Sequence, residues 1–383
     1  MAFLRNRAVN WINLHSGIQA LAQGMGGVFV LVFLLRAGIS IPVTLCAIAL
    51  IFTGRFVTRP VVLASGKRWG LKPLVVFGCL VIALQYPLLA EVHGVDRTLL
   101  AYCLISALGD TFYWSSYHAY FALLGDSEHR GHQIGAGVAL SAIVGIVAPL
   151  LGAWSLVHFG PRLAFGTVGV VQALAAAPLL ATPNVFVPPT APGALRSALL
   201  GVSLFATDGW FSAAFDLVWQ IALFLSLGQS LSAYGGAMAL AALVGAVSGM
   251  LLGRHIDRGN GLRALGIAYP VVAATLALRA VSLGTPWLAV AANAFGALAG
   301  CLQRPVQMTP VYNLGKASPC ALRFMIAAEG GWDVGCVCGC LAAAALVSDG
   351  ISLSAVISLA VLGLAAQALL LGRYYSRSAA AVI

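Results

Sequence analysis

Apolar residues form long, nearly unbroken stretches along the chain, separated by short segments that contain proline, glycine or charged residues. A helix needs about 20 apolar residues to cross a bilayer, whereas the strands of a transmembrane barrel alternate in polarity over about 10 residues. The stretches therefore predict helical crossings, which we place near residues 9–36, 41–65, 72–92, 98–124, 132–157, 162–183, 197–227, 231–253, 262–282, 285–308, 319–346 and 351–372. We expect an all-α integral membrane protein with twelve transmembrane helices.

The composition excludes a soluble globular protein. Of the 383 residues, 61% are hydrophobic and 8% are charged, whereas soluble proteins contain about 25% charged residues. The 21 lysines and arginines outnumber the 11 acidic residues, which in a soluble protein would suggest nucleic acid as a partner. In a membrane protein, loops that stay in the cytoplasm explain the same excess. We expect the lipid bilayer, and no nucleic acid, as a partner.

The distribution of positive charge predicts the orientation in the membrane. With the N-terminus inside, the cytoplasmic segments hold fourteen positive residues, namely Arg5, Arg7, Lys67, Arg68, Lys72, Arg130, Arg196, Arg254, Arg258, Arg263, Lys316, Arg323, Arg373 and Arg377. The outer loops and span ends hold four, namely Arg36, Arg97, Arg162 and Arg279. Because positive loops stay in the cytoplasm, we expect a multi-pass protein of the cell (inner) membrane with both termini cytoplasmic.

The longest connection, residues 184–196, is rich in proline and lies between the sixth and seventh predicted helices. Proline interrupts helices, so we expect this segment to be a central cytoplasmic linker. It separates an N-terminal six-helix half, residues 1–183, from a C-terminal six-helix half, residues 197–383. Two halves with equal numbers of helices suggest an internal repeat.

One short motif supports the repeat. After the eighth predicted helix, the run GRHIDRGNGLR contains Gly253, Asp257 and Arg258. At the matching place after the second helix the chain reads KRWGLK, in which Arg68 and Gly70 fit the pattern. Both runs resemble the G-x-x-x-D-R-x-G-R-R/K loop of the major facilitator superfamily.

This resemblance implies the fold of that superfamily, two pseudo-symmetric six-helix halves that rock about a site at the bilayer midplane. It also implies that the loops form a conformational latch on the cytoplasmic side, made by Lys67, Arg68, Gly70, Gly253, Asp257 and Arg258. In the family the acidic position faces the N-terminal end of a helix in the other half, where a carboxylate is favoured. Asp257 fits that role, whereas Lys67 replaces the acidic residue in the first copy.

A second similarity begins with Arg130-Gly131 and continues in the fifth predicted helix, which reads GIVAPLLGA from Gly145. It is similar to the G-P-x-x-G-G motif of the family's exporters, with Ala148 and Ala153 in place of two glycines. The motif favours export. Alternatively, its small residues and proline let helices 5 and 8 pack closely.

Five acidic residues fall inside predicted crossings, namely Asp110, Asp208, Asp216, Glu329 and Asp333. An ionisable residue near the bilayer centre costs at least about 2.5 kcal/mol, so each requires a partner, a water-filled cavity or a function. The resemblance implies that helices 1, 4, 7 and 10 line the central cavity. We therefore predict a substrate site made by Asp110, Trp114, Tyr117, Asp208, Asp216, Trp219, Gln220 and Arg304.

Helical spacing supports this choice. Asp110, Trp114 and Tyr117 share one face of the fourth helix with His118, which we expect to form an ordinary hydrogen bond. In the seventh helix, Asp216, Trp219 and Gln220 share a face, and Asp208 is rotated from it by about 80°. The alternative is that these side chains only mediate contacts between helices.

Glu329 and Asp333 lie one turn apart on the eleventh helix. Two carboxylates at that spacing in a low-dielectric site cannot both ionise cheaply, so we predict that they share a proton and couple transport to it. The alternative is a structural ion pair with Arg304 or Arg323.

Two arginines of the second helix, Arg55 and Arg59, also lie one turn apart. Their two guanidinium groups could together bind a carboxylate or a phosphate group. Alternatively, Arg59 extends to the membrane boundary and joins the latch, while Arg55 pairs with an acidic residue of the eleventh helix.

No motif for enzyme chemistry is found. The run from Cys336 through Cys338 to Cys340 cannot direct three thiolates to one point on a helix, so we expect no metal site. The chain has no C-x-x-C pair, Walker loop, H-E-x-x-H or G-x-S-x-G motif, and so we expect neither an enzyme nor a cofactor, with a proton gradient as the energy source.

These features predict a monomeric secondary active transporter that moves a small organic solute by alternating access, with proton-coupled efflux as the favoured mode. The alternative within the class is an uptake symporter or a facilitator of an organic anion. From another class, the same scaffold could serve as a lipid flippase-like protein or a receptor that does not transport.

Overall fold

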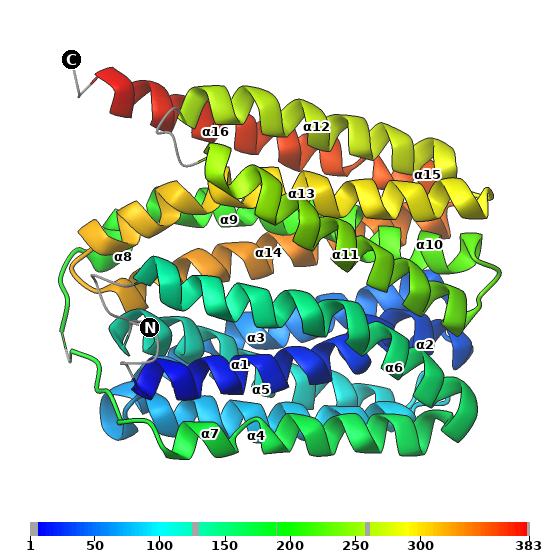
Figure 1. Ribbon diagram of the computed structural model, residues 1–383, viewed down its shortest axis with the longest axis horizontal. Coiled ribbons are helices and arrows are strands. Elements are labelled where there is room, and N and C mark those ends of the chain that lie inside the picture. Colours follow the sequence, from blue (N-terminus) through cyan, green and yellow to red (C-terminus); the bar gives the residue numbers. More distant parts are fainter. Residues whose placement is uncertain (1–6, 125–129, 189, 257–260, 381–383) are drawn as a thin grey trace. The chain divides into compact units, whose positions relative to one another are not determined.

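A computed structural model describes residues 7–124, 130–188, 190–256 and 261–380 (Figure 1). Within these ranges the regular structure is helical and there is no β-strand. Nine helices in the described ranges are long and apolar enough to cross a membrane. The all-helical, multi-pass membrane protein expected from the sequence is therefore confirmed.

The chain forms two compact units. The first contains Met1–Ile39 and Leu50–Ala191, and the second contains Ser40–Ala49 and Pro192–Ile383. The helix α3 contributes residues to both.

The first unit contains the elements α1 (Arg7–Met25), η2 (Gly27–Phe29), α2 (Val30–Arg36), most of α3 (Ile41–Trp69), α4 (Leu71–Ala90), α5 (Arg97–Leu124), α6 (Arg130–Leu174) and α7 (Ala177–Leu180). Helix α6 is interrupted at Gly160, whose φ of 77° lies in the left-handed region that favours glycine. Pro161 follows and starts the second part of α6. The predicted crossings 132–157 and 162–183 lie on either side of this break.

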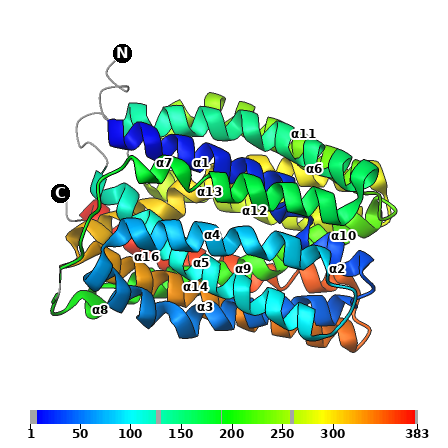
Figure 2. The ribbon, with the colours of Figure 1, turned by 90° about the horizontal axis from the view of Figure 1, so that it is seen from below.

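Within this unit, α1 packs against α6, and α4 packs against both α5 and α6 (Figure 2). Glycines make these approaches possible. A Cβ atom at Gly78 would overlap the backbone of Tyr113, and one at Gly152 would overlap the carbonyl group of Met25. The small residues of the exporter-like motif thus face α1 inside the first unit.

An exposed ion pair joins the end of α4 to the break in α6. Arg162 donates hydrogen bonds from Nε to Oε1 of Glu91 (2.8 Å) and from Nη2 to Oε2 (2.9 Å). The hydrogen bonds from Arg162 lower the pKa of Glu91. The side chains of Arg162 and Glu91 are 75% and 46% exposed, and an ion pair in solvent contributes little to stability.

The second unit contains the elements α8 (Ala194–Ser197), α9 (Leu199–Ser212), η3 (Ala213–Val218), α10 (Trp219–Ser226), α11 (Leu231–Ile256), α12 (Gly261–Ser282), α13 (Pro286–Ala317), α14 (Ala321–Ser348), α15 (Leu353–Ile357) and α16 (Ala360–Ala380). Helices α9, η3 and α10 form one continuous rod in which η3 is a π-helix. A π turn contains one more residue than an α turn, so it rotates the side chains that follow by about 100°. The uniform helix assumed from the sequence is therefore wrong for this segment.

Helices α9 and α14 pack closely along their length in the second unit. Gly331, Gly335 and Gly339 of α14 all face α9, and a Cβ atom at Gly335 would overlap the carbonyl oxygen of Ala206. The reciprocal residue on α9 is Gly209, which faces the backbone of Trp332. Small residues of this kind allow membrane helices to approach until their backbones touch.

This packing gives the first prediction. We expect Gly335→Ala to lower the free energy of unfolding by about 1–3 kcal/mol, because the added methyl group forces α9 and α14 apart. Thermal unfolding of the purified protein in detergent measures the effect. Gly300→Ala is the matched control, since its Cβ would meet open space, and it should leave the melting temperature unchanged. Equal melting temperatures for both variants would contradict the packing.

Candidate substrate and coupling site

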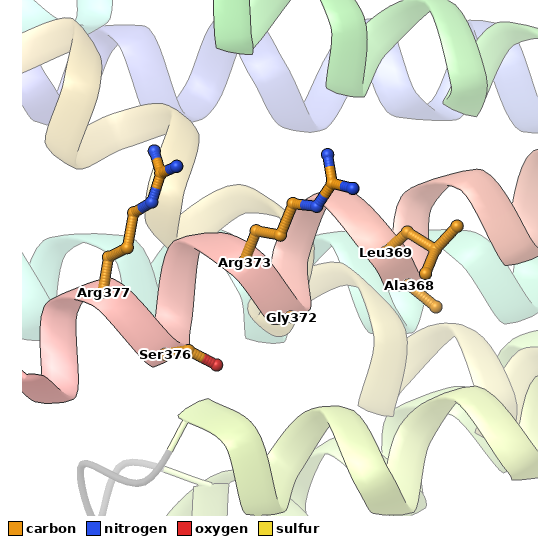
Figure 3. Close-up of a pocket in the computed structure, with 6 residues that line it drawn as sticks. All are labelled: Ala368, Leu369, Gly372, Arg373, Ser376 and Arg377. Carbon is orange, nitrogen blue, oxygen red and sulfur yellow. The ribbon is translucent and has the colours of Figure 1, made fainter.

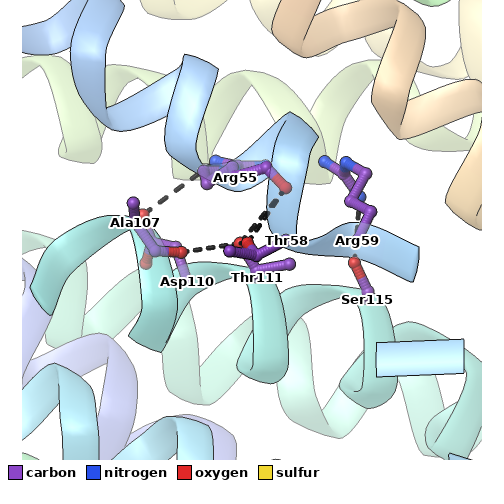
Figure 4. Close-up of polar contacts among 7 residues, drawn as sticks. All are labelled: Arg55, Thr58, Arg59, Ala107, Asp110, Thr111 and Ser115. Atoms are coloured by element: carbon purple, nitrogen blue, oxygen red, sulfur yellow. Dashed lines mark hydrogen bonds and ion pairs between the residues drawn. The ribbon is translucent and has the colours of Figure 1, made fainter. Parts of the chain in front are cut away.

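The first unit contains an ion pair between two helices (Figure 4). Arg55 of α3 and Asp110 of α5 face each other, with Nη1 of the arginine 3.9 Å from Oδ2 of the aspartate. The two side chains are 11% and 21% exposed, so the pair is accessible at an edge without being solvated like a surface pair. A Cβ atom at Gly54 would come within 2.7 Å of Ala107, and this close approach of α3 to α5 lets the charges meet.

Hydroxyl groups continue this layer along both helices (Figure 4). Thr58 donates a hydrogen bond to Thr111 (3.0 Å), and Thr111 also donates to the carbonyl oxygen of Ala107 (2.6 Å). Arg59 donates from Nη1 to Oγ of Ser115 (2.9 Å) and is only 3% exposed. The expectation that Arg59 extends to the membrane boundary and joins the latch is therefore wrong, because its side chain lies in the α3–α5 contact.

Aromatic residues adjoin this layer on α5. Trp114 and Tyr117 are half-buried, as residues of an accessible wall would be, and His118 is exposed. The ring of Trp114 stacks on that of His118 with the centroids 5.6 Å apart, and the Tyr117 hydroxyl hydrogen-bonds Ser16 of α1. The structure thus brings Asp110, Trp114 and Tyr117 together on one helix.

His15 was not identified from the sequence as part of this region. It is fully buried, donates from Nδ1 to the carbonyl oxygen of Ala175 (2.6 Å), and hydrogen-bonds the Tyr113 hydroxyl through Nε2 (2.8 Å). These bonds tie α1 to α5 and to the segment before α7. A histidine on an apolar helix gives no sequence signal that distinguishes a structural hydrogen bond between helices from a role in a functional site.

In the second unit, Gln367 of α16 connects four helices. Its amide group donates to Oδ1 of Asp208 (3.0 Å), and its carbonyl oxygen accepts from Tyr269 (2.8 Å) and Gln303 (3.2 Å). Asp208 also accepts from Gln307 and interacts electrostatically with Arg304. Asp208 and Arg304, which we expected at the edge of the site, therefore belong to one polar cluster.

A buried arginine holds the π-helix. Arg279 of α12 is 4% exposed and donates from Nη1 to the carbonyl oxygen of Phe215. Its guanidinium carbon lies 3.9 Å from the centroid of the Phe215 ring and 4.8 Å from that of Trp219. Gly296 of α13 leaves the space that the guanidinium group fills. Asp216, inside the π-helix, interacts electrostatically with Arg279.

Arg279 lies in the last turn of α12, at the span end expected from the sequence, and its side chain is buried in the second unit. Trp219 is 2% exposed, and its Nε1 donates to Oδ1 of Asn293 (3.0 Å). Its ring therefore lies in helix packing, next to the π-helix. Its role in substrate binding stays a prediction.

Gln220 and the two carboxylates of α14 have different surroundings. Gln220 is half-buried and accepts a hydrogen bond from Tyr234 (3.4 Å). Glu329 and Asp333 are 8% and 0% exposed. They point away from α9, because the glycine face of α14 is about half a turn around the helix. Their role in proton coupling stays a prediction.

The predicted latch is described only in its first copy. Gly70 has a φ of 81° and directs the chain into α4. Asn184 bridges this turn, donating to the carbonyl oxygen of Trp69 (2.8 Å) and accepting from the amide of Lys72 (3.2 Å). Lys72 donates from Nζ to the carbonyl oxygen of Thr182 (2.9 Å). The turn is therefore held by the end of its own unit.

Of the remaining latch residues, Arg68 has its guanidinium carbon 5.8 Å from the centroid of the Trp69 ring. Lys67 and Arg68 are exposed on α3, and Gly253 lies in α11. Asp257 and Arg258 lie outside the described residues. The three cysteines of α14 are arranged as helical spacing requires, with Sγ of Cys336 4.0 Å from Sγ of Cys340 and Cys338 exposed elsewhere.

Comparison with solved structures identifies the fold. PepTSo, a transporter of the POT family, superposes with a TM-score of 0.66 at 13% identity, covering 97% of this chain and 98% of its own. The human organic anion transporter MFSD10 (TETRAN) gives 0.66 at 16% identity, covering 94% and 99%. An auto-inhibited POT family peptide transporter gives 0.68 at 15% identity, covering 97% of each chain. At these identities the likeness shows the fold.

The sequence itself shows the family. The family model of the Major Facilitator Superfamily matches residues 12–319, whereas no curated protein matches the chain. The protein is a membrane-embedded secondary transporter for a small-molecule substrate, and it belongs to the Major Facilitator Superfamily. The resemblance seen in the sequence is confirmed.

The buried arginine gives the second prediction. We expect Arg279→Lys to lower the free energy of unfolding by about 2 kcal/mol, because an ammonium group cannot both stack on two rings and bond the Phe215 carbonyl group. Thermal unfolding in detergent checks this. Arg196→Lys, at an exposed position of α8, is the control and should have no effect. An unchanged melting temperature in Arg279→Lys would show that the guanidinium geometry is unimportant.

Proposed function

We propose that the protein carries a small organic solute with an anionic group across the membrane together with a proton. The observation that carries this proposal is the ion pair between Arg55 of α3 and Asp110 of α5. Carboxylate and guanidinium groups are costly inside a membrane and persist there where they serve a function.

The pair can exchange partners. When Asp110 is ionised, it compensates the charge of Arg55. When Asp110 binds a proton, it loses that role, and a carboxylate or phosphate of the solute can take its place on the guanidinium group. Proton and solute therefore favour each other's binding, and by linkage the two effects are equal in size. This is the thermodynamic requirement of a symporter.

The fold comparisons agree with an anionic or zwitterionic solute. Two of the similar structures are transporters of the POT family, one of them a peptide transporter, and the third is an organic anion transporter. Half-buried Trp114 and Tyr117 next to Asp110 supply apolar walls for the organic part of the solute. In the same scheme, Glu329 and Asp333 of α14 are candidates for a second protonation site.

Alternating access in twelve crossings and two six-helix halves is the accompanying structural proposal. Two pairings of helices recur in both units. In the first unit α1 packs on the first part of α6 and α4 packs on α5, and in the second unit α9 packs on α14 and α12 packs on α13. This repetition is what two pseudo-symmetric halves would produce.

Efflux is the second candidate. It is favoured by Asp208 and Asp216, which could attract an organic cation in the second unit, and by the exporter-like motif. In that mode the solute moves against the proton rather than with it.

Solute-driven proton movement tests the proposal and separates the two modes. Purified protein is reconstituted in vesicles that contain a pH-sensitive dye, and dipeptides, dicarboxylates, organic cations and neutral sugars are added outside. We expect a dipeptide or dicarboxylate to acidify the interior. Asp110→Asn should abolish this acidification, because the residue can no longer exchange a proton. Arg55→Gln should weaken solute binding at least tenfold, about 1.4 kcal/mol.

The exposed Glu91→Gln variant is the control and should transport like the unchanged protein. Alkalinisation driven by an organic cation would instead support efflux. Acidification that persists at full rate in Asp110→Asn would refute the role of the ion pair.

A further inference from the structure

The last helix, α16, has two different faces. Gln367, Leu371 and Tyr375 follow one another at four-residue spacing and point into the second unit. Gln367 and Leu371 are fully buried, and the Tyr375 hydroxyl donates to the carbonyl oxygen of Val306 on α13 (2.7 Å). A Cβ atom at Gly261 would overlap the Tyr375 ring. The C-terminal end of α16 is therefore anchored to α12 and α13 by one face.

The other face carries a pair of arginines. Arg373 and Arg377 lie one turn apart, both are exposed, and their guanidinium groups extend in the same direction (Figure 3). They line a pocket of about 410 Å³ together with Ala368, Leu369, Gly372 and Ser376. The pocket is thus basic at one end and apolar at the other, with a glycine between them.

The position of this pocket along the helix matches the membrane boundary. The apolar span to which α16 belongs runs from Leu353 to Arg377, so the arginines lie in its last two turns. Ala368 precedes Arg377 by nine residues, which is roughly 13 Å along the helix. A helix that crosses the bilayer over this span would place the basic end at the level of the lipid headgroups and the apolar end at the level of the acyl chains.

The two positive charges have no acidic neighbour on their own helix. Residues 360–380 contain neither aspartate nor glutamate. The Arg55–Asp110 and Arg162–Glu91 ion pairs of the described residues involve neither arginine of this pocket. Two guanidinium groups at this spacing can bind one phosphate group through paired hydrogen bonds.

We propose that the pocket on α16 binds an anionic phospholipid, with its phosphate between Arg373 and Arg377 and an acyl chain along Leu369 and Ala368. A soluble phosphate compound would use only the basic end and leave the apolar end exposed. A phospholipid uses both, and basic pockets at membrane level are typical sites for anionic headgroups.

Lipid-dependent thermal unfolding tests this proposal. The full-length protein in detergent is titrated with phosphatidylglycerol, with phosphatidylcholine and with glycerol phosphate, and the rise in melting temperature gives the affinity of each. We expect phosphatidylglycerol to raise the melting temperature, with little effect from the other two. Arg373→Gln should weaken the affinity about tenfold, the scale of one lost charge-assisted bond, and Arg373→Gln with Arg377→Gln should abolish it.

The control is Arg196→Gln, which removes one exposed positive charge from the same unit and should keep the full lipid effect. Arg373→Lys with Arg377→Lys keeps the charge but loses the paired geometry, so its affinity should be intermediate. A lipid effect that is unchanged in the double Gln variant would overturn the proposal. An equal effect of glycerol phosphate would also overturn it, since the ligand would then be a soluble anion.

Discussion

Charge inside a membrane is the constraint on which this structure depends. Water is absent from the hydrocarbon core, so each ionisable group must find its partners within the protein. Asp110 forms an ion pair with Arg55, and Arg59 donates a hydrogen bond to Ser115. Asp208 accepts a hydrogen bond from Gln367, and Arg279 donates one to the carbonyl oxygen of Phe215. Each partner lies on a different helix or helical segment, so satisfying these groups also determines which helices pack together.

Such pairings require helices that approach very closely, and glycine makes the approach possible. Gly54 brings α3 to α5 at the level of the Arg55–Asp110 pair, and Gly296 leaves space for the guanidinium group of Arg279. Between α9 and α14, glycines allow backbone contact along the interface. In lipid there is little hydrophobic gain from bringing helices together, so close packing and polar contacts supply the cohesion.

Arg279 and the Arg55–Asp110 pair differ in how freely their charged groups can change partners. Arg279 is enclosed between two aromatic rings and a carbonyl group, and moving it would expose a charge to an apolar interior. The Arg55–Asp110 pair has a separation of 3.9 Å and partial exposure of both side chains. A group that must bind and release a proton in each transport cycle needs such an accessible, loosely held partner.

The sequence predicted the all-helical class and the family, because both follow from local periodicity or a short motif. It did not reveal the partner of Arg55 or the burial of Arg59, since both depend on the rotation of α3 against α5. It did not reveal the burial of Trp219 or the π-helix before it, because nothing in the residues 213–218 signals a π-helix. Arg279 near the end of α12 resembled an ordinary boundary residue, and only the tertiary structure shows its burial.

The central claim is that solute binding and protonation of Asp110 are linked. Titration calorimetry in two buffers of different ionisation enthalpy measures directly how many protons the protein takes up per bound solute. The account predicts an uptake that approaches one proton per dipeptide or dicarboxylate bound as the pH rises above the pKa of the coupling carboxylate, and no uptake in Asp110→Asn. A wild-type protein that binds such a solute without taking up a proton at any pH would contradict it.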